Sequence, residues 1–206
     1  MFLSTGRLHT LLFPSLTWRM DSPHVYLTFD DGPHPSATPA VLDVLESHAV
    51  PATFFLSGCN IKGNESIVRQ TAEAGHTLGI HAWSHTRMLV VSKRRTSDEI
   101  RETSRLAADC TGVTPVWFRP PFGFFSWNTI AAAREAGCRI AMWSVMPGDF
   151  KPWSDTQIID RTMHGLAPGA IIVLHDNPLT AGRIAPLLDA MLRKIKGAGH
   201  TFAPLP

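Results

Sequence analysis

The sequence predicts a parallel α/β domain, and an irregular (β/α) barrel with its helices outside is the favoured architecture. Strand-like and helix-like segments alternate along 206 residues, a length that suits a single domain. The strand-like segments are apolar throughout, as expected of parallel strands that helices cover on both faces. No glycine-rich phosphate loop follows the first strand, which counts against a dinucleotide-binding fold. An open doubly wound sheet also fits this alternation.

Short apolar runs mark the strands in chain order. They are 25–29, 52–56, 77–80, 116–118, 139–145 and 170–174, with a last short strand near Phe202. Three of the helical segments between them are closed by Gly75, by Gly137 or by Pro168-Gly169. The helical segments are 39–48, 65–74, 97–110, 127–136, 155–166 and 184–196. Ser97 is the expected N-cap of the third helix, and the basic run 93–95 is expected to be a solvated loop before it. About seven βα units result, so we expect a distorted (β/α)7-type barrel.

Composition excludes several classes of protein. The chain is 44% hydrophobic and 17% charged, which is enough apolar material for a buried core. Its net charge of +2 is too small to indicate a nucleic-acid partner. Cys59, Cys110 and Cys138 are odd in number and far apart, so neither a disulfide framework nor a thiolate zinc site is predicted. We expect three buried, unreactive thiols.

The N-terminal stretch 8–16 is apolar but is interrupted by His9, Thr10 and Pro14. It is too short to span a bilayer, and no clear small-residue cleavage site follows it. We therefore expect residues 1–22 to be an extension that packs on a domain of residues 23–206. A cytoplasmic location is favoured over export, and we expect a monomer without a transmembrane segment.

Ionisable residues follow five of the predicted strands. They are Asp30-Asp31, His81, Arg119, Asp149 and His175-Asp176. A single aspartate after a strand is usually a turn or helix cap, and a single histidine is usually a satisfied surface or core residue. Five such positions at the carboxyl ends of parallel strands are hard to explain by capping, because those ends meet at one rim. The pattern indicates a functional site there.

Two histidines four residues apart, His81 and His85, can converge on one ion if the loop between them curls. With a carboxylate from the first strand they would form a three-ligand set that leaves positions open for water and substrate. Such ligands suit Zn²⁺, Co²⁺, Ni²⁺ or Fe²⁺ rather than Ca²⁺. Successive side chains of a strand point apart, so Asp30 and Asp31 should have different tasks, one binding the metal and the other accepting a proton from water.

These motifs together resemble the polysaccharide deacetylases, the NodB-homology domain of carbohydrate esterase family 4. The motifs are Thr28-Phe29-Asp30-Asp31-Gly32-Pro33, His81-x-x-Ser84-His85, Arg119-Pro120-Pro121-Phe122-Gly123 and Leu174-His175-Asp176. They occur in the family's order, and the resemblance extends over nearly the whole chain. It implies a distorted (β/α) barrel.

The resemblance implies a role for each matching position around the metal. Asp31, His81 and His85 match the metal ligands, with Zn²⁺ the favoured ion and Co²⁺ or Ni²⁺ as alternatives. Asp30 matches the general base. Arg119 matches the residue that pairs with this base and orients it.

On the substrate side, the main-chain amide of Phe122, within the segment Pro121 to Gly123, matches an oxyanion-hole donor. His175 matches the general acid, Asp149 its acidic partner, and Leu174 a wall of the pocket for the acetyl methyl group. Trp153 is expected in the sugar-binding groove. The chain departs from the family in having Phe122 where tyrosine is usual. It also has Met146-Pro147-Gly148-Asp149-Phe150 where Asp-x-x-Asp-Trp is common.

The function implied is hydrolytic, metal-dependent removal of the N-acetyl group from an N-acetylglucosamine-containing glycan, either peptidoglycan or a chitin oligosaccharide. Two rival functions remain at this stage. One is another hydrolase on the same scaffold, such as an acetyl xylan esterase. The other is a glycan- or metal-binding module without turnover, which has no physical need for both Asp30 and His175.

Overall fold

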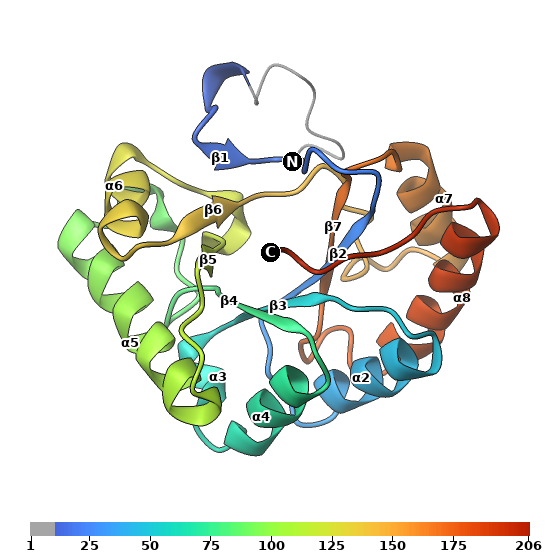
Figure 1. Ribbon diagram of the computed structural model, residues 1–206, viewed down its shortest axis with the longest axis horizontal. Helices are drawn as coiled ribbons and strands as arrows, with labels where there is room; N and C mark the ends of the chain where they lie inside the picture. The colour runs from blue at the N-terminus through green and yellow to red at the C-terminus, as the bar shows by residue number, and fades with distance from the viewer. Residues whose placement is uncertain (1–10) are drawn as a thin grey trace.

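The computed structural model describes residues 11–206 and shows a curled sheet of seven parallel strands with helices around it. The strand order is β1-β6-β5-β4-β3-β2-β7. Beyond the end of β6, Val145 forms a parallel bridge to Ile172 of β7, so the two sides of the curled sheet meet. The predicted (β/α)7-type barrel is confirmed in this distorted form (Figure 1).

The elements alternate along the chain as predicted, except that the seventh strand is β1, which was not predicted, and that the strand expected near Phe202 is a single bridge to Val25. The strands are β1 (Leu16–Thr17), β2 (Tyr26–Asp30), β3 (Thr53–Leu56), β4 (Thr77–Ile80), β5 (Trp117–Phe118), β6 (Arg139–Ala141) and β7 (Ile171–His175). The helices are α2 (Ala37–Ser47), α3 (Gly58–Ile61), α4 (Glu65–Glu73), α5 (Lys93–Thr111), α6 (Trp127–Glu135), α7 (Asp155–Gly165) and α8 (Ile184–Gly197). Two 3₁₀ turns, Met88–Val90 and Pro121–Gly123, lie in the loops after β4 and β5.

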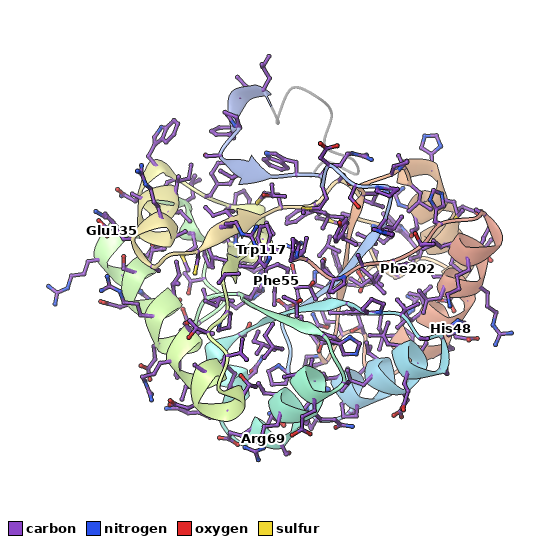
Figure 2. All side chains as sticks on the ribbon, in the orientation of Figure 1. His48, Phe55, Arg69, Trp117, Glu135 and Phe202 are labelled. Carbon is purple, nitrogen blue, oxygen red and sulfur yellow. The ribbon has the colours of Figure 1, made fainter. Side chains whose placement is uncertain are left out.

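The sheet separates two apolar layers because successive strand residues point to opposite faces. In β2, Leu27 and Phe29 belong to the layer beneath the outer helices, and Tyr26 belongs to the layer enclosed by the strands. Phe55 and Trp117 also belong to this inner layer, and Figure 2 shows them within the ring of strands. Asp30 shares the face of Tyr26, so its carboxylate points inward.

The C-terminal residues close the barrel at the amino ends of the strands. Leu205 is fully buried, its N–H donates to Thr53 Oγ1, and its carbonyl accepts from Thr77 Oγ1, both at 2.9 Å. The Trp117 indole donates to the Pro206 carbonyl at 2.8 Å. Because Thr53, Thr77 and Trp117 begin their strands, only the opposite end, where the carboxyl ends lie, is left open for a site.

Three sequence predictions are corrected. Helix α5 begins at Lys93, and Ser92 is its N-cap, accepting a hydrogen bond from the Arg95 N–H, whereas Ser97 lies buried inside the helix. The run 93–95 is exposed as expected but forms the first helical turn, because the cap precedes it. Of the three thiols expected to be buried, Cys138 is buried, Cys110 is half-buried and Cys59 is exposed.

Of the apolar stretch 8–16 and the expected extension 1–22, residues 1–10 lie outside the described residues. Within the described part, β1 pairs with β6, Trp18 is buried, and Phe13 packs edge-on against Phe125 with ring centroids 4.9 Å apart. No helix within residues 11–206 has the length and apolar character needed to cross a bilayer.

Candidate active site

A cavity of about 490 Å³ opens at the carboxyl ends of the strands. It is lined by residues that follow or end β2, β3, β4, β5 and β7 and by the segment after β6. The lining residues are Asp30, Asp31, Ser57, Cys59, Asn60, His81, His85, Phe122, Trp143, Met146, Phe150, Val173, His175, Asn177, Pro178 and Leu179. Five strand ends therefore deliver side chains to one hollow, as expected for a parallel barrel.

Asp31, His81 and His85 converge at one side of this cavity. One ligand atom from each lies within 4.8 Å of the other two. Asp31 Oδ1 is 2.8 Å from His85 Nε2 and 3.4 Å from His81 Nε2, yet this buried oxygen accepts no hydrogen bond of regular geometry within the described chain. Three lone pairs facing a common point, one of them on a buried atom without a donor, fit a divalent cation.

The surroundings of the three residues hold them in this arrangement. His81 Nδ1 lies 2.8 Å from the Arg119 carbonyl, which turns Nε2 toward Asp31. The Asn177 side-chain amide donates to Asp31 Oδ2 at 2.7 Å, so Oδ1 is the oxygen left for an ion. Burial would raise the pKa of Asp31, but its contacts with the two imidazoles hold that pKa well below its ordinary value. The carboxylate is therefore charged.

Asp30 lies next to this cluster and is held by a buried arginine. Arg119 is fully buried, and its Nη1 donates to Asp30 Oδ1 and to Thr28 Oγ1, both at 2.7 Å. The remaining guanidinium donors reach the carbonyls of Ala141 at 3.1 Å and Met142 at 2.9 Å. Because all three guanidinium nitrogens donate, Arg119 is held in place, fixes one oxygen of Asp30 and leaves the other to accept a proton.

His175 lines the same cavity and pairs with Asp149. Its Nδ1 lies 3.0 Å from Asp149 Oδ1, and its main-chain N–H donates to Asp149 Oδ2 at 2.7 Å. Burial by itself would lower the pKa of His175, but Asp149 and the charges of Asp31 and Asp30 raise it to about 9. Phe150 packs edge-on against the imidazole, with centroids 5.0 Å apart. The imidazole is thus a cation near neutral pH.

Phe122 presents a free main-chain donor beside the cluster. Its N–H donates to no residue of the described chain, whereas those of Gly123 and Phe124 close the 3₁₀ turn. Its ring lies against His85 with centroids 4.5 Å apart. Its φ of 58° is left-handed, a conformation that costs a non-glycine residue about 1–3 kcal/mol.

This strain is concentrated around the cavity. Among the described residues, five non-glycine positions have a positive φ, and four of them are Asp31, Ala82, His85 and Phe122. Three of these line the cavity, and Ala82 follows His81. Strained backbone persists only where its surroundings enforce it, which is common at functional sites.

Several residues that support the site were not predicted. Glu99, a buried residue of α5, accepts hydrogen bonds from the main-chain N–H groups of Trp83 and Ser84 and from the Ser84 hydroxyl. It therefore holds the loop between His81 and His85. No sequence signal could have found it, because a single acid on a helix looks like any solvated charge.

Asp176, which the sequence predicts at this rim without a specific role, also supports the site. Its carboxyl is buried, accepts from the Thr38 hydroxyl, and occupies the space into which a Cβ at position 32 would project. Position 32 therefore requires glycine, and the turn after Asp31 packs directly on this carboxyl. Burial, together with the charges of Asp31 and Asp30, raises the pKa of Asp176 to about 8.

Four of the five expected substrate contacts, all except Phe122, do not line the cavity. Leu174 is fully buried in the layer beneath the outer helices, whereas Val173 lines the cavity. The residue two positions before His175 shares its face of β7, so strand alternation would have selected Val173. Trp153 packs against the outer core, with the Arg161 guanidinium 4.2 Å from its ring centroid, and lies outside the lining. Pro121 is buried under the Phe122 turn, and Gly123 packs against Trp143.

A family model described as polysaccharide deacetylase matches residues 18–141, more than half of the chain. The chain belongs to the polysaccharide deacetylase family. Peptidoglycan-N-acetylglucosamine deacetylase PgdA of Listeria monocytogenes is 36% identical to this chain over 181 residues. The match covers 88% of this chain and 38% of PgdA. A chitooligosaccharide deacetylase of Bradyrhizobium is 36% identical over 153 residues, 74% of this chain and 70% of that protein. This chain thus spans well under half the length of PgdA.

Solved structures of the family share the fold. The Bc1960 peptidoglycan N-acetylglucosamine deacetylase is 32% identical with a TM-score of 0.87, covering 93% of this chain and 90% of that one. BA3943 of Bacillus anthracis, a family 4 carbohydrate esterase pseudoenzyme, is 28% identical with a TM-score of 0.83, covering 91% of this chain and 66% of that one. A pseudoenzyme with this fold means that membership of the polysaccharide deacetylase family does not by itself establish activity. Activity depends on the side chains in the cavity.

Proposed function

We propose that this polysaccharide deacetylase hydrolyses the N-acetyl group of N-acetylglucosamine units in a glycan and releases acetate, with a divalent cation, preferably zinc, held by Asp31, His81 and His85. The observation that carries the proposal is the placement of three groups of side chains around one cavity. They are the ligand cluster, the Arg119-held Asp30 and the His175–Asp149 pair. A module that only binds glycan or metal would need neither the Asp30–Arg119 pair nor the His175–Asp149 pair.

A cation bound there would supply Lewis-acid chemistry, polarising a carbonyl and making water more acidic. Asp30 is oriented to take the proton of the attacking water on its free oxygen, because Arg119 holds the other oxygen at 2.7 Å. The Phe122 N–H is free to donate to the oxyanion that develops on the acetamide carbonyl. His175, charged near neutral pH, donates its proton to the departing nitrogen.

The protonated His175 favours an amide over an ester as the substrate. An amine leaves poorly unless it is protonated, whereas an alcohol of an acetyl ester leaves more readily. Asp149 raises the pKa of His175 and thereby keeps that proton in place at neutral pH. An esterase would gain less from this buried pair.

The test is acetate release from chitotetraose, peptidoglycan and acetyl xylan, each measured before and after treatment with a chelator. We expect release from the first two substrates, loss on chelation and recovery with added zinc. Acetate from acetyl xylan alone would instead establish an esterase, and glycan binding without any acetate would establish a binding module.

Two substitutions test the metal-ligand role of the cluster and the base role of Asp30 separately. His81→Ala removes one of three ligands, so metal content measured by elemental analysis should fall sharply. Asp30→Asn is isosteric and keeps the ligands, so it should retain the metal but lose most turnover. Full metal occupancy in the His81→Ala protein would contradict the assignment of the ligands.

A further inference from the structure

Two cationic side chains, Arg87 and Lys151, lie on aromatic residues that form walls of the cavity. Phe122 and Phe150 both line it. The Arg87 guanidinium lies over the Phe122 ring, and the Lys151 ammonium lies over the Phe150 ring. Both cations are solvent-exposed, and neither side chain makes an ion pair or a hydrogen bond with any residue between 11 and 206.

Arg87 lies on the side of the metal cluster. Its guanidinium carbon is 5.5 Å from the centroid of Phe122 and 5.6 Å from that of Phe124. Phe122 in turn packs against His85. Contact with two aromatic rings restricts a long, flexible side chain to the rim without using any of its five N–H donors. The guanidinium is held in place with its hydrogen-bonding capacity available.

Lys151 lies on the side of the general acid. Its ammonium is 5.3 Å from the centroid of Phe150, which packs edge-on against His175. The segment that carries Lys151 is anchored, because Arg183 donates to the main-chain carbonyls of Lys151 and Trp153. Two cation–aromatic pairs therefore flank the cavity, one beside the ligand cluster and one beside the acid.

The acids close to these two loops are already paired. Glu99 accepts from the Trp83–Ser84 loop and from Arg95, and Asp155 pairs with Arg183. Neither acid is left to neutralise Arg87 or Lys151. A substrate entering the cavity thus meets an unpaired positive charge on each side, which favours anionic groups at both positions.

We propose that Arg87 and Lys151 are two carboxylate subsites, and that the substrate is a glycan with acidic groups on both neighbours of the deacetylated sugar. This inference rests on the proposed function and narrows its substrate. In peptidoglycan strands every N-acetylglucosamine lies between two N-acetylmuramic acids, each bearing a lactyl ether, whereas the neighbours in chitin are neutral. The acidic group is either the lactyl carboxylate or a carboxylate of the attached peptide.

The test compares three tetrasaccharides. The first is the peptide-free alternating tetramer of N-acetylglucosamine and N-acetylmuramic acid, the second is the same tetramer with its carboxyls converted to primary amides, and the third is chitotetraose. For an exposed ion pair worth up to about 1 kcal/mol we expect each subsite to contribute about two- to fivefold in kcat/KM. The wild type should therefore prefer the acidic tetramer over its amide by about four- to 25-fold at low salt, and less at high salt.

Arg87→Gln and Lys151→Gln should each lower this acid-to-amide ratio by about two- to fivefold, and the double variant should bring it close to one. Arg69→Gln is the matched control, because Arg69 is exposed on the outer side of α4, away from the cavity (Figure 2). Its ratio should equal that of the wild type.

The outcomes separate this inference from the proposed function. Equal kcat/KM of the wild type for acidic and amidated substrates, both as peptide-free tetramers and as peptide-bearing strands, would refute the subsites while leaving deacetylation intact. A preference for the acidic tetramer that survives in the double variant would refute the assignment to these two residues. If the preference appears only with peptide-bearing strands, the peptide carboxylates are the ligands. Failure to release acetate from any of the three tetramers would refute the proposed function itself, and the inference with it.

Discussion

Replacement of Glu99 by alanine should weaken metal binding although Glu99 contacts none of the three ligands. Its carboxylate accepts from the main-chain N–H groups of Trp83 at 3.3 Å and Ser84 at 3.2 Å, and from the Ser84 hydroxyl at 3.0 Å. These donors lie between His81 and His85. The substitution therefore releases the loop that sets the spacing of the two imidazoles.

The size of the effect follows from the groups left without an acceptor. A buried donor that loses its acceptor destabilises the folded arrangement by about 1–3 kcal/mol of free energy. Trp83 is half-buried and Ser84 is exposed, so water replaces part of what is lost, and we expect about 2 kcal/mol in total. That corresponds to about thirtyfold in affinity, within the 10- to 100-fold range typical of residues that orient metal ligands.

The assay is calorimetric titration of zinc into the metal-free protein, with thermal unfolding measured in parallel. Glu102→Ala is the control, since Glu102 lies on the same helix and pairs only with the exposed Arg105 among the described side chains. The zinc Kd of the control should match that of the wild type. A Kd for Glu99→Ala within twofold of the wild type would show that the loop holds its shape without the carboxylate.

Three further predictions concern protonation. His175→Ala should lower kcat on an acetamide by about 10²–10⁴, and unchanged acetate release would contradict a role as general acid. Because the pKa of His175 is raised to about 9, kcat should fall as pH rises through that value; Asp149→Asn should move this descending limb to lower pH, which a pH–rate profile measures. The pKa of Asp176 is raised to about 8, so the folded metal-free protein keeps a proton that the unfolded chain releases above its ordinary value of 3.8. Its free energy of unfolding should therefore fall as pH rises from about 4 to 8, by up to about 1.4 kcal/mol per pH unit, and urea unfolding of Asp176→Asn should lose that slope.

The sequence was most informative where a residue's role depends on its own position in a strand. Alternating segments with polar residues at strand ends are enough to place Asp30, His81 and His175 on one rim, because parallel strands have only one carboxyl edge. The error at Leu174 arose from assigning a residue by its neighbour in a motif rather than by its face of the strand. Alternation from His175 selects Val173.

Contacts between distant segments could not be predicted in this way. Glu99 reaches the His81–His85 loop from α5, and Asn177 reaches Asp31 from beyond β7. Their side chains give no local signal, since an acid on a helix and an amide in a loop are ordinary surface residues. Only the packing of the elements determines which of them are buried next to the site.

Arg119 positions two residues of the site, one through its main chain and one through its side chain. Its carbonyl orients His81, and its side chain holds Asp30. A displacement of the chain at this position would therefore disturb the proposed ligand His81 and the proposed base Asp30 together. It also follows that no side-chain substitution here removes the imidazole's anchor, because that anchor belongs to the main chain. Damage at position 119 should therefore disable proton abstraction while the imidazole stays aligned.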